Sequence, residues 1–247
     1  MKGLGSLRAE LSTGDRGSNP GIVAIVFTVL FVAGLVPVTL LVSETHFPAP
    51  VQTPEEIVAY FQAEAINVTV CAFLQFCSAI PLGIFTAVMV SRLRYHGAQA
   101  TGVLIALFGG MTASCAVALS ALIQWTIAQP GIANDGALTR ALYFLIFAIG
   151  GPGYSVPFGL LIAGLSVPAV SMGLLPRWLG VFGVILGIVG ALSALDLLSH
   201  RALLLIPLTR FPGFVWMIAA GFKLPGRAWP SIGVGSPQRS RAPGVGG

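Results

Sequence analysis

The sequence predicts an all-α polytopic membrane protein, a bundle of six transmembrane helices with a short amphipathic helix on its outer side. Hydrophobic residues make up 55% of the 247 residues and charged residues only 9%, whereas about a quarter of the residues in a water-soluble domain are charged. The charges form a few clusters, separated by apolar runs that reach the roughly 18 residues at which a transmembrane helix is recognised. These observations exclude a soluble globular protein.

Six segments are long enough to cross a bilayer. A helix in lipid must pair its own backbone N–H and C=O groups, and about 20 residues cross the hydrocarbon. One domain, residues 20–224, is expected to carry all the spans, between disordered tails at 1–19 and 225–247 that are rich in Gly, Ser, Pro and Arg. We expect the spans at residues 21–42, 65–90, 98–128, 141–165, 178–195 and 202–222.

The fourth uncharged segment is too long for one straight span. Residues 141–176 carry no charge, and a straight helix of that length would measure about 54 Å. The sequence Gly-Gly-Pro-Gly at 150–153 lies near its middle, and proline removes one intrahelical hydrogen bond. We expect a kinked span that ends near Leu165, followed by a short stretch along the inner surface up to Leu175.

Basic residues indicate the orientation, because Lys and Arg in short loops stay on the cytoplasmic side. With six spans, both tails share one side with the loops after the second and fourth spans, and most of the 13 Lys and Arg residues fall there. We therefore expect both termini in the cytoplasm, with anionic lipid headgroups beside them. Nothing in the net charge of +5 indicates a nucleic-acid partner.

The longest outer segment contains a helix start. Residues 53–56, Thr-Pro-Glu-Glu, combine an N-cap hydroxyl, a proline in the first turn and two acids. Ile57, Tyr60 and Phe61 follow at the spacing of one helical face. This pattern predicts a short amphipathic helix that covers the bundle; the alternative is a lid over an outer cavity.

Arg210 is the clearest polar residue at membrane depth, where an ionisable side chain costs at least about 2.5–3.5 kcal/mol and requires a partner or a purpose. Asp196 lies near the outer end of the preceding span, within reach of an arginine side chain. We predict an ion pair between Asp196 and Arg210; alternatively, Arg210 extends to the headgroups and Asp196 marks a helix end.

Three further residues are candidates for the same outer pocket. Glu64 and Asn67 share a helix face at the top of the second span, and Tyr154 lies beside the expected kink. Together with Arg210 they suit an anionic or zwitterionic solute. The alternative is that they are polar residues at a water interface.

The fifth span carries glycines on one helical face, a pattern that lets two helices approach closely. Packing against a neighbouring span is the first interpretation, and contact with a second copy or another membrane protein is the alternative. The glycines are Gly180, Gly183, Gly187 and Gly190.

No catalytic, cofactor or metal signature was found. The three cysteines fall inside predicted spans, the three histidines are scattered, and the sequence lacks the nucleotide, hydrolase and zinc-protease motifs. We expect neither an enzyme nor a bound cofactor or metal.

The sequence Leu-Pro-Arg-Trp-Leu-Gly at 175–180, with residues 205–216 and 219–222, resembles bacterial six-span membrane proteins classed as a domain of unknown function. The resemblance implies an all-helical bundle in a bacterial cytoplasmic membrane, and it implies no activity. We therefore expect a non-catalytic accessory or scaffold protein of that membrane. The alternative is a small-solute transporter or channel with an outer-facing polar pocket around Arg210.

Overall fold

The computed structural model describes residues 19–39, 53–98 and 101–225, and this part of the chain is helical without a strand. Six stretches in it are long and apolar enough to cross a membrane, as predicted. The protein is therefore a multi-pass membrane protein. The predicted tails fall outside the described residues, apart from Asn19 and Pro225.

The α-helices are α2 (Pro20–Thr39), α3 (Pro54–Ala63), α4 (Ala65–Tyr95), α5 (Thr101–Ile127), α6 (Gly136–Gly150), α7 (Pro152–Ser171), α8 (Arg177–Leu192) and α9 (Leu205–Lys223), and short 3-10 helices are η1 (Ile132–Asn134), η2 (Ser193–Leu197) and η3 (His200–Ala202).

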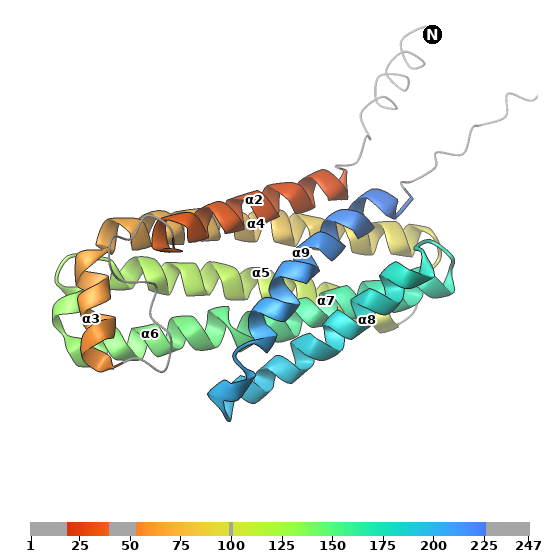
Figure 1. Cartoon of the computed structure of the whole chain (residues 1–247). Coiled ribbons are helices and arrows are strands. Elements are labelled where there is room, and N and C mark those ends of the chain that lie inside the picture. The colour runs from red at the N-terminus through yellow and green to blue at the C-terminus, as the bar shows by residue number, and fades with distance from the viewer. Residues whose placement is uncertain (1–18, 40–52, 99–100, 226–247) are drawn as a thin grey trace, which may run out of the picture.

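The long helices run side by side, and α8 and α9 form a tilted hairpin on one half of the bundle (Figure 1). The start of α2 and the end of α9 lie together, because a Cβ added at Gly21 would meet the Phe222 ring at 2.6 Å. The two described chain ends therefore share one end of the bundle with the α4–α5 and α7–α8 connections. Which side of the membrane this end faces remains a prediction.

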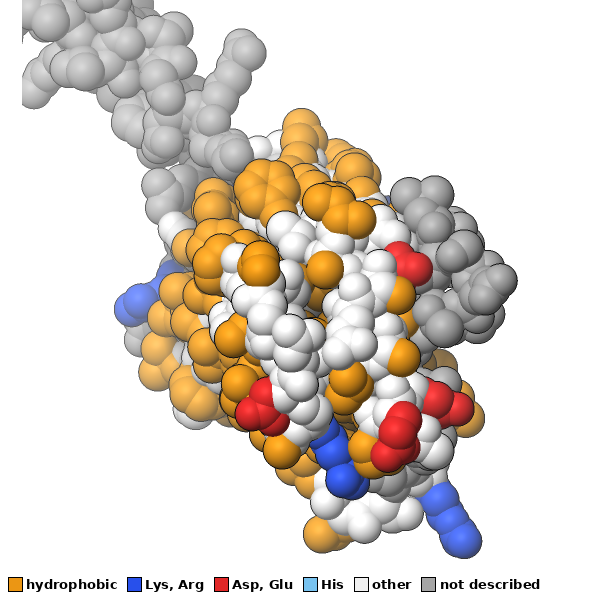
Figure 2. All heavy atoms as spheres, turned by 90° about the vertical axis from the view of Figure 1, so that its left-hand side faces the viewer, with side chains coloured by type: hydrophobic (Ala, Val, Ile, Leu, Met, Phe, Trp, Pro, Cys, Tyr) orange, Lys and Arg blue, Asp and Glu red, His pale blue; other side chains and the backbone are white. Residues whose placement is uncertain are grey.

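Charged residues divide between the two ends of the described bundle. Figure 2 looks onto the end covered by α3, where acidic side chains gather around a largely apolar body. Glu55, Glu56 and Asp135 belong to this end. The opposite end carries basic residues, namely Arg92, Arg94, Arg177 and Lys223.

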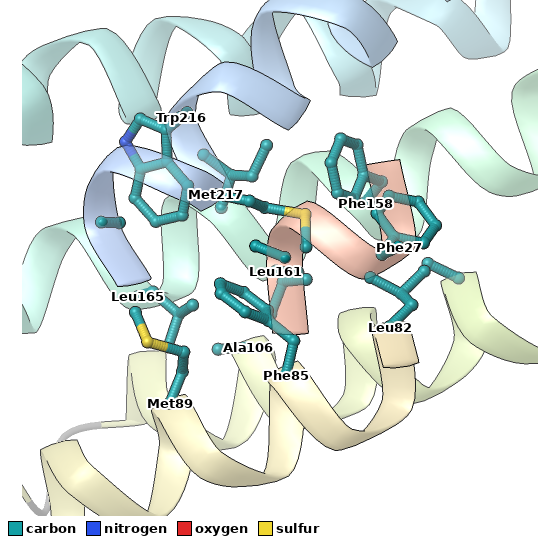
Figure 3. Packing of buried hydrophobic residues seen from close by; sticks show 14 of the residues in the cluster. Phe27, Leu82, Phe85, Met89, Ala106, Phe158, Leu161, Leu165, Trp216 and Met217 are labelled. Carbon is teal, nitrogen blue, oxygen red and sulfur yellow. The ribbon is translucent and has the colours of Figure 1, made fainter. Parts of the chain in front are cut away.

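The core between the spans consists of apolar side chains from six helices, and Figure 3 shows part of it. Phe27 of α2, Phe85 of α4 and Leu161 of α7 are each 0% exposed. Trp216 of α9 is also buried, and its indole N–H donates to the Leu179 carbonyl at 2.9 Å. Trp216 thus packs inside the bundle.

The fourth span differs from the prediction at both ends. α6 begins at Gly136, before Arg140, because the Asp135 carboxylate accepts hydrogen bonds from two amides of the first turn at 3.0 Å. After a break at Gly151, α7 continues to Ser171. The expected end near Leu165 and the surface stretch after it are therefore wrong.

α7 passes Pro168 because its apolar side chains are packed on several sides. The neighbouring Leu165 and Ala169 are both buried, so the loss of one hydrogen bond at proline is offset by packing. The helix stops instead before Gly173, whose φ of +69° lies in the left-handed region that glycine adopts readily.

The outer helix α3 has the predicted start and the predicted buried face. The Thr53 hydroxyl accepts from the Glu56 amide, and the Glu56 carboxylate accepts from the Thr53 amide, which forms a capping box. Ile57, Tyr60 and Phe61 are each 1% exposed. Burial raises the pKa of the Tyr60 hydroxyl above its usual value, with Cys71 and Glu64 adding to the effect. α3 therefore covers one end of the bundle.

Candidate functional site

The Arg210 side chain lies where α9 meets the break between α6 and α7. Its Nη2 donates a hydrogen bond to the Gly150 carbonyl. Its guanidinium carbon also lies 5.2 Å from the centre of the Phe31 ring and 5.1 Å from that of Tyr154. One hydrogen bond and two aromatic faces therefore hold this partly buried cation.

The break explains why a backbone carbonyl is available to Arg210. Gly151 has φ −86° and ψ −104°, and Pro152 has no N–H to continue the helix. The Tyr154 amide, which would meet the Gly150 carbonyl in a continuous helix, donates to Gly151 at 3.2 Å instead. A carbonyl left open at membrane depth must be paired by another group, and Arg210 supplies that group. A cation also suits the negative end of the α6 dipole.

Arg210 has donors left over. A guanidinium carries five N–H donors, and the Nε of Arg210 is buried without a hydrogen-bond partner among the described residues. The side chain makes no ion pair within that part of the chain. Because a charge with a buried, unpaired donor is costly at membrane depth, the arrangement favours an additional anionic partner.

A cavity of about 430 Å³ adjoins Arg210. Its size falls within the range of about 300–1,000 Å³ typical of small-molecule sites. The described lining includes no carboxylate, and most of it is apolar. It comes from α2 (Phe31, Leu35, Val38, Thr39), α4 (Cys71, Gln75), α5 (Val117, Ser120, Gln124), α6 and the break (Ile146, Phe147, Gly150, Gly151) and the start of α9 with the residues before it (Leu203, Leu204, Ile206, Pro207, Arg210).

α4 and α5 contribute most of the other polar groups of the lining. The Gln124 amide nitrogen lies 3.5 Å from the Cys71 sulfur, and the Ser120 hydroxyl donates to the Ile146 carbonyl at 3.2 Å. Gln75 of α4 also lines the cavity and lies beside α2, since a Cβ added at Gly34 would meet its Cγ at 3.3 Å. The cavity therefore has uncharged hydrogen-bonding groups on one wall and a single cation on another.

Stacked aromatic rings continue from Arg210 into the core. The Tyr154 ring stacks on Phe158 at 5.1 Å and on Phe31 at 6.3 Å, and Phe214 packs edge-on against Phe31 at 5.3 Å. Tyr154 is 0% exposed, and its hydroxyl has no hydrogen-bond partner among the described residues. All four rings are buried side chains of α2, α7 and α9.

Asp196 does not form the predicted ion pair with Arg210. It lies in η2 and is 2% exposed, and it does not line the cavity. Arg210 instead points from α9 towards the opened end of α6, because the Gly150 carbonyl there replaces the carboxylate as its partner. The ion-pair prediction was therefore wrong.

Glu64 and Asn67 lie away from the cavity. The Asn67 amide donates to the Glu64 carboxylate at 2.6 Å, so they share a helix face as expected. However, neither of them lines the cavity, and Cys71, the first cavity residue of α4, lies seven residues beyond Glu64, about 10 Å along the axis. Their assignment to the pocket of Arg210 is corrected for this reason. Tyr154, which does contact Arg210, lies behind the cavity lining.

Sequence reasoning missed several cavity residues. Gln75 and Gln124 are uncharged but polar, and their position inside apolar spans was a signal for them. The partner of Arg210 carried no such signal, because it is a backbone carbonyl.

The glycine stripe of α8 packs against α7 and α9 of the same chain. Cβ atoms added at Gly187 and Gly190 would lie 2.6 Å from Ala163 and 2.8 Å from the Ser155 carbonyl of α7, and one added at Gly183 would meet Trp216 of α9 at 2.6 Å. At Gly180 the side chain of Val170 fills the space. The stripe lets α8 pack closely on its neighbours, and the alternative of contact with a second copy through these glycines has no support in this arrangement.

No group of three or more metal-ligating side chains occurs among the described residues. Comparisons with protein-family models, curated proteins and solved structures find no match to this chain. The resemblance to bacterial six-span proteins therefore stays a prediction.

Proposed function

We propose that this multi-pass membrane protein is a non-catalytic accessory protein that binds a small monoanionic molecule in the Arg210 cavity. The observation that carries the proposal is the single cation in the lining, whose Nε has no described partner. An anion placed there forms a charge-assisted hydrogen bond and balances the partly buried charge.

Binding without chemistry agrees with the described lining. Cys71 is its most reactive side chain, and the neighbouring polar group within hydrogen-bond distance is the Gln124 amide, which is no base. The aromatic rings of Phe31, Tyr154 and Phe158 pack against one another beyond Arg210. A bacterial cytoplasmic membrane and cytoplasmic termini remain part of this proposal, on the basis of the resemblance and the basic loops.

A small-solute transporter is the second candidate, favoured by the break at Gly151 beside the cavity. Many transporters bind solutes at discontinuous helices near mid-membrane. Under this candidate the aromatic rings move apart during a cycle. Uptake of a labelled monoanion into proteoliposomes, abolished by Arg210→Met, favours transport, whereas binding without uptake favours the accessory role.

The binding test uses the full chain in nanodiscs of zwitterionic phosphatidylcholine, with benzoate as the anion and benzamide as its neutral match. Benzoate is expected to raise the midpoint of thermal unfolding and benzamide to leave it unchanged. Arg210→Met removes the benzoate effect. Arg140→Met is the matched control, because Arg140 is an exposed arginine over the Phe144 ring at 5.7 Å, away from the cavity. An equal benzoate effect in the Arg210 variant contradicts the proposal.

A further inference from the structure

We infer that the ligand of the Arg210 cavity is a long single-chain carboxylate that reaches the site from the bilayer, through an opening beside α2, α6 and the start of α9. This inference rests on the proposed function and adds the chemical class of the ligand and its route. It follows from the depth of the cavity rim, the apolar lining and the lone cation.

The rim of the cavity is exposed at the outer end of α2 and at the start of α9. Thr39, Leu204 and Pro207 line the cavity and are all exposed, with Leu204 at 76%. α9 begins beside the junction of α6 and α7, so it does not cover the length of α6 (Figure 1). The cavity therefore opens on the lateral surface of the described bundle, next to the first turn of α9.

The position of this rim along the bundle places it at the outer edge of the hydrocarbon. Arg140, an exposed arginine in the first turns of α6, marks the headgroup level. Gly150 lies ten residues further, about 15 Å deeper. Arg210 contacts Gly150, and Leu204 precedes Arg210 by six residues, at most about 9 Å of rise. Taking Arg210 and Gly150 at one level, the rim lies about 6 Å below the level of Arg140.

The turn beside the rim combines strongly exposed leucines with the exposed Arg201, which precedes Leu204 by three residues. Leu197 is 67% exposed and Leu198 is 85% exposed. Leucines exposed to this degree are unfavourable in water and favourable in hydrocarbon. The rim therefore lies close to the boundary between headgroups and acyl chains, where a single-chain lipid of the bilayer reaches it.

The lining favours a ligand that has one negative charge and an otherwise apolar structure. Arg210 is the one cation among the described lining residues, so a second negative charge on the ligand has no partner in an apolar site. A carboxylic acid also crosses hydrocarbon in its neutral form and ionises beside Arg210, where the cation favours the carboxylate. The volume of about 430 Å³ lies in the lower part of the small-molecule range, which fits one chain better than two.

The direct test measures binding of tritiated palmitate to the full chain in phosphatidylcholine nanodiscs, and photolabelling by a palmitate with a diazirine in its tail. Wild-type protein is expected to bind palmitate and to carry the label on residues of the cavity and its rim. Arg210→Met lowers the affinity about tenfold or more, as expected for loss of a hydrogen bond to a charged group. Arg140→Met leaves the affinity unchanged.

A pair of rim variants tests the route. Leu204→Trp fills the rim and is expected to slow palmitate association several-fold, while the benzoate effect on thermal unfolding persists. Leu208→Trp is the matched control, because Leu208 is also an exposed leucine of α9 at 52% and does not line the cavity. Equal association rates in the two variants overturn the lateral route.

The remaining outcomes separate this inference from the proposed function. Benzoate stabilisation without palmitate binding overturns the long-chain ligand and leaves anion binding intact. Absence of both effects in wild-type protein overturns both. Labelling confined to the lipid-facing groove of Thr69, Phe73 and Trp125, unaffected by Arg210→Met, identifies adsorption on the surface and overturns the inference. Tighter Arg210-dependent binding of lysophosphatidate than of palmitate overturns the carboxylate assignment.

Discussion

Replacing Gly109 by alanine tests how closely α5 and α7 approach each other. A Cβ at this position would lie 2.5 Å from the Pro157 carbonyl oxygen, 2.7 Å from the Leu161 amide nitrogen and 2.8 Å from the Leu160 Cβ. Two of these atoms belong to the backbone, so no side chain can rotate away. The two helices must separate by about 0.9 Å to reach an ordinary contact of 3.4 Å.

The cost of that separation is expected to exceed the gain from alanine. Overpacking a tight core costs about 1–3 kcal/mol, and alanine in place of glycine in a helix gains about 1 kcal/mol. Gly109→Ala should therefore lower the free energy of unfolding by up to about 2 kcal/mol. Gly83→Ala is the matched control, because its Cβ would meet Ser114 at 3.4 Å, an ordinary contact. It should be neutral or stabilising.

Unfolding in mixed micelles, followed by circular dichroism as sodium dodecyl sulfate is added, gives both free energies. If Gly109→Ala proves as stable as Gly83→Ala, α5 and α7 do not approach as closely as described. The reasoning from close glycine contacts then fails for α8 as well, because it uses the same kind of contact.

Three further substitutions test single contacts. Tyr154→Phe keeps the ring and removes a buried hydroxyl without a described partner, so the protein should be equally stable or about 1 kcal/mol more stable in the same titration; a loss indicates a hidden partner. Thr53→Ala removes the α3 cap and should cost about 1 kcal/mol, seen as faster amide exchange in α3 alone. Trp216→Phe leaves the Leu179 carbonyl without its indole donor and should cost about 1–3 kcal/mol; an unchanged midpoint contradicts that bond.

The spans and the outer helix were predictable because local physics determines them. Apolar length fixes a helix in lipid, so α8 and α9 begin and end within a few residues of the expected positions. The capping box at Thr53 is likewise a local pattern, and the spacing of Ile57, Tyr60 and Phe61 identified the face that is buried.

The candidate site was only partly predictable. Arg210 was recognised from the cost of a charge in lipid, but its partner depends on how α9 crosses the broken fourth span. Opposite charges nearby in the sequence favoured Asp196, and nothing in the sequence marks a carbonyl as open. Gln75 and Gln124 reach the cavity only through the packing of α4 and α5 around it.

The hydrogen-bond partners of Arg210 test the central claim most directly. They can be read from a cryo-electron microscopy map of the protein purified in its native lipids, at a resolution that separates side chains. We predict that Nη2 contacts the Gly150 carbonyl and that an elongated non-protein density in the cavity ends within hydrogen-bond distance of Nε. A guanidinium fully bonded to protein groups, such as the Asp196 carboxylate, beside a collapsed cavity would contradict the account.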